Sequence, residues 1–380
     1  MRLSIHIHNH KRNTAAEEEE EEQETMRALS KGNAAAASKV SGNVQAWNAR
    51  CRSVRANATS AAPHIDTWDA TFPTPKRAFL FPGQGAQYVG MAEALAEEVP
   101  AAKEMFDRAS ELLGYDLLQV CAQGPGEKLN TTAVSQPAIY VASLAALEKL
   151  SSSENGKEII EGVNVAAGLS LGEYTALVFA GAIGFEDGLR LVKARGEAMQ
   201  EAAEAAQSGM VSVIGLDAQK CEELCKAASE ESGQPVQIAN YLCKGNYAIS
   251  GSIEAIEAVE AIAKPNFKAR MTVRLAVAGA FHTSFMNPAV DRLKEILEAT
   301  PIVSPRIPVL SNVDVKAHMD PQDIRNTLAK QIVSPVQWER TLELLIASGL
   351  EESYEIGPGK VIAGIMKRVD RKSPVTNIEA

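Results

Sequence analysis

A serine at position 170 lies in the pattern Gly-x-Ser-x-Gly, which residues 168–172 form. The apolar segment Val163–Ala167 before it predicts a β-strand, and residues 171–180 after it predict a helix. In such a sharp strand-to-helix turn the glycines leave room for a strained backbone, and the serine hydroxyl stands at the end of the sheet. The N-terminus of the following helix stabilises negative charge that develops there. The pattern therefore predicts Ser170 as a nucleophile, with a structural serine in a turn as the alternative.

A serine nucleophile needs a base that accepts its proton. Beyond residue 70 the sequence contains two histidines, His282 and His318. His282 follows a predicted strand that ends near Val277, and this strand-to-loop position suits a catalytic group. His318 lies in the polar run 314–320, which is typical of a solvated loop. We therefore expect His282 to be the base, with a capping or core histidine as the alternative.

Acyl transfer also needs two hydrogen-bond donors for the tetrahedral oxyanion. The backbone N–H of Leu171, directly after Ser170, can supply one. The loop Pro82–Gly85, which ends the predicted strand Ala78–Phe81, can supply the N–H of Gln84 as the second. A glycine-rich loop can also hold phosphate, but this one lacks the GxxxxGK[ST] and GxGxxG spacings.

Arg195 is the most informative charged residue. It lies in a predicted helix over residues 185–205, and Leu191, Val192 and Met199 stand three or four positions away on the same face. Arg195 therefore points with the apolar side, and a buried guanidinium has to be paired. The partner is either a structural carboxylate or the carboxylate of a substrate, which the planar guanidinium can bind with two hydrogen bonds.

From Lys76 onward, strand and helix patterns alternate, which predicts an α/β fold with a parallel sheet covered by helices. Within residues 206–274 the predicted order is βαββαβ, the split βαβ arrangement of a ferredoxin-like subdomain. We expect this subdomain to be inserted into a core made of residues 73–205 and 275–380. Its predicted strands are residues 210–216, 236–241, 247–250 and 270–277, and its helices are 217–231 and 253–264. In the core we further expect helices at 88–98, 136–150, 288–299, 321–332 and 338–348, and strands at 307–312 and 352–356.

The net charge of −10 divides unevenly, with −4 in residues 1–25, +6 in residues 26–64 and −12 in the remainder. Residues 26–64 are rich in Ala, Ser, Asn and Arg and lack acidic residues, which is typical of an organelle transit peptide. We therefore predict a disordered leader over residues 1–72 that directs the protein to the plastid stroma, with the mitochondrial matrix and a plain disordered tail as alternatives. Because the run Glu17–Glu22 would spoil such a signal, Met26 is a candidate for the true start.

The composition also excludes several classes of protein. An acidic body argues against nonspecific nucleic-acid binding, which needs a basic face. No window approaches 18 consecutive apolar residues, so we expect no membrane span. The five cysteines form no CxxC pair, which argues against a zinc site or a disulfide framework and fits a reducing compartment.

Several motifs together resemble the malonyl-CoA:acyl carrier protein transacylases, from about Arg77 to Arg368. They are Phe81–Gly85, Gly168–Glu173, Arg195, Gly279–His282, Gln331–Trp338 and Gly357–Gly359, in that order. The resemblance implies an α/β-hydrolase-like core with a ferredoxin-like insertion. It also implies that Ser170 accepts the acyl group, His282 is the base, Gln84 is an oxyanion donor and Arg195 holds the malonyl carboxylate.

Two further roles rest on the resemblance alone. In this family a backbone carbonyl orients the histidine, and Gln331 matches that position, while Asn240 matches an asparagine near the pocket. The chain departs from many members at Leu169, where they have histidine before the nucleophile.

The resemblance implies that malonyl-CoA donates a malonyl group to Ser170, and that the phosphopantetheine thiol of acyl carrier protein accepts it, for fatty acid synthesis. We expect a monomer that needs no cofactor and no metal. Two alternatives remain: an esterase or thioesterase that uses the same Ser170–His282 pair, and a non-enzymatic docking protein on an acyltransferase fold.

Overall fold

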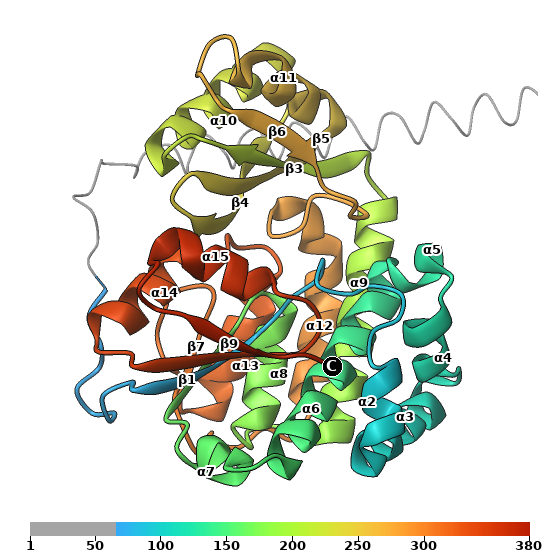
Figure 1. The fold of residues 1–380 in the computed structure, drawn as a ribbon. Coiled ribbons are helices and arrows are strands. Elements are labelled where there is room, and N and C mark those ends of the chain that lie inside the picture. Colours follow the sequence, from blue (N-terminus) through green and yellow to red (C-terminus); the bar gives the residue numbers. More distant parts are fainter. Residues whose placement is uncertain (1–65) are drawn as a thin grey trace, which may run out of the picture. The chain divides into compact units, whose positions relative to one another are not determined.

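The computed structural model describes residues 66–380, and within them the strands form two separate sheets (Figure 1). Most of the predicted transit peptide, including Met26, lies outside the described residues. The two sheets and the helices around them give the α/β architecture that the sequence predicts.

The first sheet is parallel, with the strand order β7-β2-β1-β8-β9. Strands β1 and β2 pair along their length, and Phe81 lies opposite Gly168 at their last pair. The loop after β1 and the turn after β2 therefore start at the same edge of the sheet, which brings Gln84 and Ser170 together. The strands are β1 (Arg77–Phe81), β2 (Val165–Gly168), β7 (Val309–Leu310), β8 (Glu352–Ile356) and β9 (Val375–Ile378).

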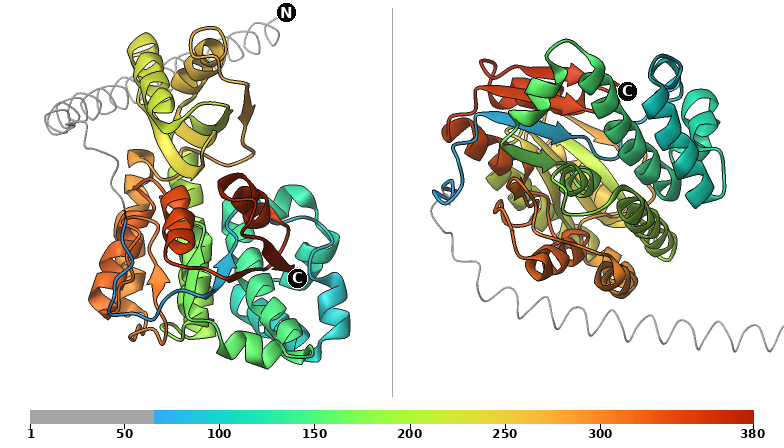
Figure 2. Two further views of the ribbon diagram at one scale, coloured as in Figure 1. Left: turned by 60° about the vertical axis from the view of Figure 1, so that its left-hand side comes forward. Right: turned by 90° about the horizontal axis from the view of Figure 1, so that it is seen from below.

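Helices cover both faces of this sheet, because its buried strands present apolar side chains to both sides (Figure 2). Phe79 and Phe81 of β1 join the larger core, while Ala78 and Leu80 point to the opposite face and pack with α14 (Trp338–Ala347) and α15 (Val361–Val369). The helices of the larger core are α2 (Glu93–Glu98), α3 (Pro100–Leu113), α4 (Leu117–Gln123), α5 (Gly126–Leu129), α6 (Thr132–Ser152), α7 (Gly156–Glu161), α8 (Leu171–Phe179), α9 (Phe185–Glu204), α12 (Asn287–Ala299) and α13 (Pro321–Gln331).

The second sheet is antiparallel, with the strand order β4-β5-β3-β6. One face packs against α10 and α11 around a core of its own, while Met210 and Ala248 on the other face join the larger core. The elements follow the predicted βαββαβ order: β3 (Ser208–Ile214), α10 (Ala218–Ser232), β4 (Val236–Cys243), β5 (Asn246–Ser252), α11 (Ile253–Ala263) and β6 (Met271–Arg274).

Most predicted elements lie within a few residues of their observed bounds, but some expectations need correction. The helix predicted from residue 88 begins at Glu93, after turns that expose Tyr88 and Val89. The strand predicted over 307–312 pairs only at Val309 and Leu310. The pattern did not predict the helices α3, α4, α5, α7 and α15 or the strand β9.

The leader predicted over residues 1–72 is wrong at its end. The carboxylate of Asp66 accepts hydrogen bonds from Nε and Nη2 of Arg340, at 2.8 and 2.6 Å. Trp68 packs against the core beside α14, and its ring meets Phe72 edge to face. Residues 66–72 therefore belong to the folded body.

None of the helices among residues 66–380 combines the length and the apolar character that a bilayer span requires. The same residues contain no cluster of three or more His, Cys, Asp or Glu side chains placed to hold a metal ion.

Candidate active site

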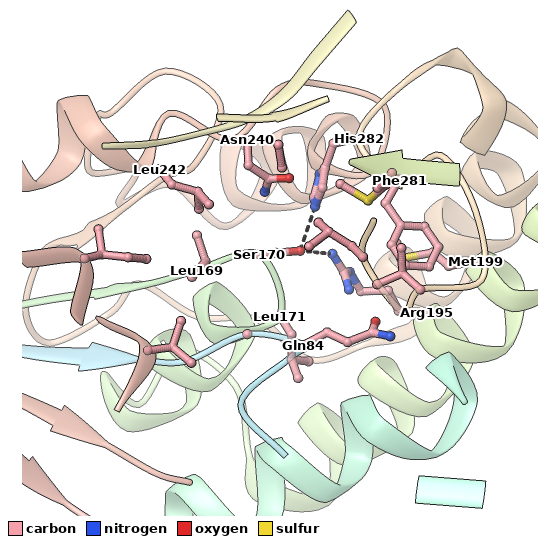
Figure 3. Close-up of a pocket in the computed structure, with 17 residues that line it drawn as sticks. Gln84, Leu169, Ser170, Leu171, Arg195, Met199, Asn240, Leu242, Phe281 and His282 are labelled. Carbon is pink, nitrogen blue, oxygen red and sulfur yellow. Dashed lines mark hydrogen bonds between the residues drawn. The ribbon is translucent and has the colours of Figure 1, made fainter. Parts of the chain in front are cut away.

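Ser170, His282 and Arg195 meet in one cavity, although they come from distant parts of the chain (Figure 3). The Oγ of Ser170 lies 2.8 Å from Nε2 of His282 and 3.0 Å from Nη2 of Arg195. The sequence predicted these three residues as nucleophile, base and carboxylate-binding group, and the structure brings all three together.

Ser170 occupies the sharp turn between β2 and α8 that the sequence predicted. Its backbone angles, φ 52° and ψ −100°, lie in a region that residues other than glycine rarely adopt. The turn is tight because a Cβ on Gly168 would overlap the backbone of Gly172, and a Cβ on Gly172 would overlap the carbonyl of Phe81. The two glycines are therefore required for space.

His282 is buried, with 3% of its surface exposed, and its tautomer follows from its partners. Nδ1 lies 2.9 Å from the backbone carbonyl of Gln331, which can only accept, so Nδ1 carries the proton. Nε2 is then free to accept the hydrogen bond from the Ser170 hydroxyl. Burial, and next the charge of Arg195, lower the pKa of His282 to about 4, so the imidazole is neutral at physiological pH.

Arg195 is 1% exposed and contacts two amides rather than a carboxylate. Nη1 donates to Oε1 of Gln136 at 2.6 Å, and Nη2 donates to Oε1 of Gln331 at 2.8 Å as well as to Ser170. No ion pair of Arg195 occurs among residues 66–380, and Nε has no hydrogen-bond partner there. The sequence left two possible partners for Arg195, a structural carboxylate and a substrate carboxylate. Among residues 66–380 no structural carboxylate pairs with it. Both hydrogens of Nη2 are used by Gln331 and Ser170, so a carboxylate that binds Arg195 in the cavity would take over the hydrogen that Nη2 donates to Ser170.

Gln84 and Leu171, the two residues predicted as oxyanion donors, both line the same cavity. Leu171 is the first residue of α8, where the helix offers its N–H no internal partner. The loop that carries Gln84 lies directly against the turn, because a Cβ on Gly83 would overlap the carbonyl of Leu169. The two predicted oxyanion donors therefore border the cavity near Ser170.

The cavity has a volume of about 240 Å³. Figure 3 shows Leu169 and Leu242 on one side of Ser170, and Met199, Phe281 and Arg195 on the other. Asn240 of β4, placed here by the resemblance, also lines it. His318 does not: its imidazole lies 3.0 Å from Asp314, and this hydrogen bond raises the pKa of His318.

Sequence reasoning missed two buried residues, Glu173 and Asn312. The side chain of Asn312 accepts a hydrogen bond from the N–H of Ser170 at 2.6 Å and donates one to the carbonyl of Gly168 at 2.7 Å, so it bridges the turn. Glu173 accepts from the N–H of Asn312 at 3.0 Å. Asn312 ends the predicted strand 307–312, and Glu173 lies one turn after Ser170, so the sequence places each at the edge of the sheet but does not reveal the contact between them.

The chain resembles proteins of one kind in both sequence and structure. Residues 78–378 match the acyl transferase domain family. The malonyl CoA-acyl carrier protein transacylase of Bacillus subtilis is 42% identical over 297 residues, which are 78% of this chain and 91% of that protein. The mitochondrial malonyl-CoA-acyl carrier protein transacylase of Mus musculus is 43% identical over 314 residues, which are 79% of this chain and 81% of that protein.

Solved structures give the same result. The malonyl CoA-acyl carrier protein transacylase of Coxiella burnetii superimposes with a TM-score of 0.74 at 38% identity, over 80% of this chain and 94% of that one. A malonyl-transacylase solved in complex with its type II polyketide synthase acyl-carrier protein gives 0.73 at 37% identity, over 80% and 94%.

The low pKa of His282 leads to a prediction about pH. If His282 takes the Ser170 proton, the neutral base is lost only as pH falls toward about 4 rather than through its ordinary 6.5. We expect an uncharged fluorophosphonate to label Ser170 at rates that agree within about twofold between about pH 5.5 and 7.5, whereas an ordinary imidazole would give a roughly tenfold fall. A midpoint near 6.5 in the measured labelling rate would contradict this assignment.

Proposed function

Since the chain belongs to the acyl transferase family, and within it to the malonyl-CoA–acyl carrier protein transacylases, we propose that it moves a malonyl group from malonyl-CoA to the phosphopantetheine thiol of acyl carrier protein, for fatty acid biosynthesis. The observation that carries this proposal is a serine–histidine pair beside a buried guanidinium without a carboxylate partner. An acyl group that bears its own carboxylate fits such a site.

In the first half of the proposed reaction, Ser170 Oγ attacks the thioester carbonyl while its proton passes to Nε2 of His282. The N–H groups of Leu171 and Gln84 hold the tetrahedral oxyanion. The intermediate collapses, the carbon–sulfur bond breaks, and the CoA thiol leaves with the proton from His282. The malonyl ester remains on Ser170, with its carboxylate bound to the guanidinium of Arg195.

In the second half the acceptor thiol attacks the ester. His282 takes the thiol proton and returns it to Ser170 Oγ when the carbon–oxygen bond breaks. The carbonyl of Gln331 keeps Nδ1 protonated throughout, so Nε2 alternates between base and acid. We propose Gln331 as the group that orients His282, and Asn240 as a wall residue of the acyl pocket.

We further propose that the parallel sheet is an α/β-hydrolase-like core and that residues 206–274 are a ferredoxin-like subdomain inserted into it. The strand order β4-β5-β3-β6, antiparallel throughout, supports the second description. We also propose that the protein is a monomer. The acidic body supports the absence of nucleic-acid partners.

For localisation we propose the plastid stroma, with the mitochondrial matrix as the alternative. The proposal rests on the composition of residues 26–64, which lie outside the described residues. The relative from Mus musculus is named as a mitochondrial protein, and the mitochondrial matrix is therefore kept as the alternative compartment for this chain. The compartment in which the tagged chain accumulates tests the choice.

Acyl carrier protein is acidic, so we propose a basic docking surface made of Lys360, Lys367, Arg368, Arg371 and Lys372. Lys367 and Arg368 lie in helix α15, and Lys360 is its N-cap residue; the same helix gives Val361 and Ile365 to the cavity wall. A second basic group, Lys264, Lys268, Arg270 and Arg274, contributes no residue to the lining of this cavity.

The function is tested by mixing the protein with malonyl-CoA and measuring the intact mass. We expect a gain of one malonyl group, its absence in Ser170→Ala, and its transfer to acyl carrier protein on addition of the carrier. Failure of the wild-type chain to take up the group, or uptake by Ser170→Ala, would overturn the proposal.

Arg195→Ala tests the acyl group and separates a transferase for malonyl groups from a simple esterase, which has no use for a buried cation. We expect malonyl transfer to fall by about 100-fold, because a buried charge pair is lost, while acetyl transfer is favoured. Arg190→Ala, on the exposed face of the same helix, is the control. A variant Arg195→Ala that keeps its malonyl preference would refute the role of Arg195.

The docking surface is tested by reversing two exposed charges, Lys367→Glu with Arg371→Glu. We expect the KM for acyl carrier protein to rise by about tenfold or more, because complementary charges speed and stabilise association, while hydrolysis of the malonyl-enzyme is unchanged. The matched control is Lys264→Glu with Lys268→Glu. An unchanged KM in the first variant would place docking elsewhere.

A further inference from the structure

Glu173 is a carboxylate in the interior, with 3% of its surface exposed, one helical turn after Ser170. Its Oε2 accepts hydrogen bonds from the backbone N–H of Asn312 and from Nε2 of Gln331, at 3.0 and 2.7 Å. Burial raises the pKa of Glu173 to about 7, although these hydrogen bonds act in the opposite direction. Burying a carboxylate at this position costs free energy of folding, so its presence calls for an explanation.

The contacts of Gln331 supply that reason. Its Nε2 has two neighbours that only accept, Oε2 of Glu173 and the carbonyl of Ser170, at 2.7 and 2.9 Å. Its Oε1 faces Nη2 of Arg195, which only donates, at 2.8 Å. The amide therefore has one orientation that satisfies every neighbour, and Glu173 helps to impose it.

The orientation matters because of what Arg195 has to do. A carboxylate in direct contact with the guanidinium would compete with a substrate carboxylate for it. Glu173 instead acts through one intervening amide, which holds Nη2 where it also donates to Ser170 Oγ. Glu173 thus fixes the position of the cation without contacting it.

We propose that Glu173 is a positioning residue that sets the preference for an acyl group bearing a carboxylate, by holding the Gln331 amide that seats Arg195. This inference rests on the proposed malonyl transfer and adds a residue that acts on its selectivity. Glu173 touches neither the Ser170 hydroxyl nor the cavity, so its effect passes through Gln331 and Arg195.

The experiment compares Ser170 acylation by malonyl-CoA and acetyl-CoA in Glu173→Ala, Glu173→Gln and Gln331→Leu. The measurement is the ratio of the two acylation rates, each normalised to folded protein. Glu355→Ala is the matched control, because Glu355 is also a buried glutamate that accepts backbone N–H groups, from Ile362 and Ala363, but lies outside this network.

We expect the malonyl-to-acetyl ratio to fall by about tenfold or more in Glu173→Ala and in Gln331→Leu, because Arg195 contacts the malonyl carboxylate and an acetyl group offers it none. Glu173→Gln retains an oxygen acceptor and should restore most of the ratio. Glu173→Ala combined with Gln331→Leu should lose no more than either alone, because both act in one chain of contacts.

A ratio that stays unchanged in Glu173→Ala and Gln331→Leu would overturn the proposal, as would an equal loss of both acyl groups. If Glu173→Ala fails to fold, Gln331→Leu and Glu173→Gln decide the question by the same ratio. Failure of the proposed function is a distinct result, because the wild-type chain itself would then not take up malonyl.

Discussion

The constraint that organises the described part of the chain is the buried guanidinium of Arg195, which forms no ion pair with a carboxylate among residues 66–380. Arg195 is nearly inaccessible to solvent, yet its hydrogen bonds go to Gln136, Gln331 and Ser170. Amide oxygens satisfy two of its nitrogens without cancelling its charge. The ring of Tyr174 lies 5.0 Å from the guanidinium carbon and adds a favourable surface for a cation. The structure thus holds a cation in the interior, beside the Ser170 hydroxyl.

The same cation affects the neighbouring histidine. A positive charge beside His282 disfavours a second one, and burial acts in the same direction, so the imidazole stays neutral and ready to accept a proton. Because Gln331 gives a carbonyl to Nδ1 and an amide oxygen to Arg195, one residue orients both groups. No aspartate is needed for the histidine, and a carboxylate close to it would compete for Arg195.

The sequence was most informative where local geometry decides the outcome. Ser170, with its glycines, had to lie in a strand-to-helix turn, and the side of the helix on which Arg195 lies followed from three apolar neighbours. Glu173 and Asn312 were not predicted, because their roles depend on contacts between segments about 140 residues apart. The strand before Asn312 shows the same limit. The predicted strand extends over 307–312, but only two of its residues pair with β2. Beyond the last pair, the Asn312 side chain donates a hydrogen bond to the carbonyl of Gly168 in the turn that carries Ser170.

The two sides of the cavity differ in a way that fits transfer better than hydrolysis. Arg195 lies on one side of Ser170, and Leu169 and Leu242 lie on the other (Figure 3). At the position before the nucleophile, Leu169 adds an apolar side chain and joins the core beneath α15. Both half-reactions bring a long thioester or thiol chain to the same serine, and an apolar wall favours such a chain over water.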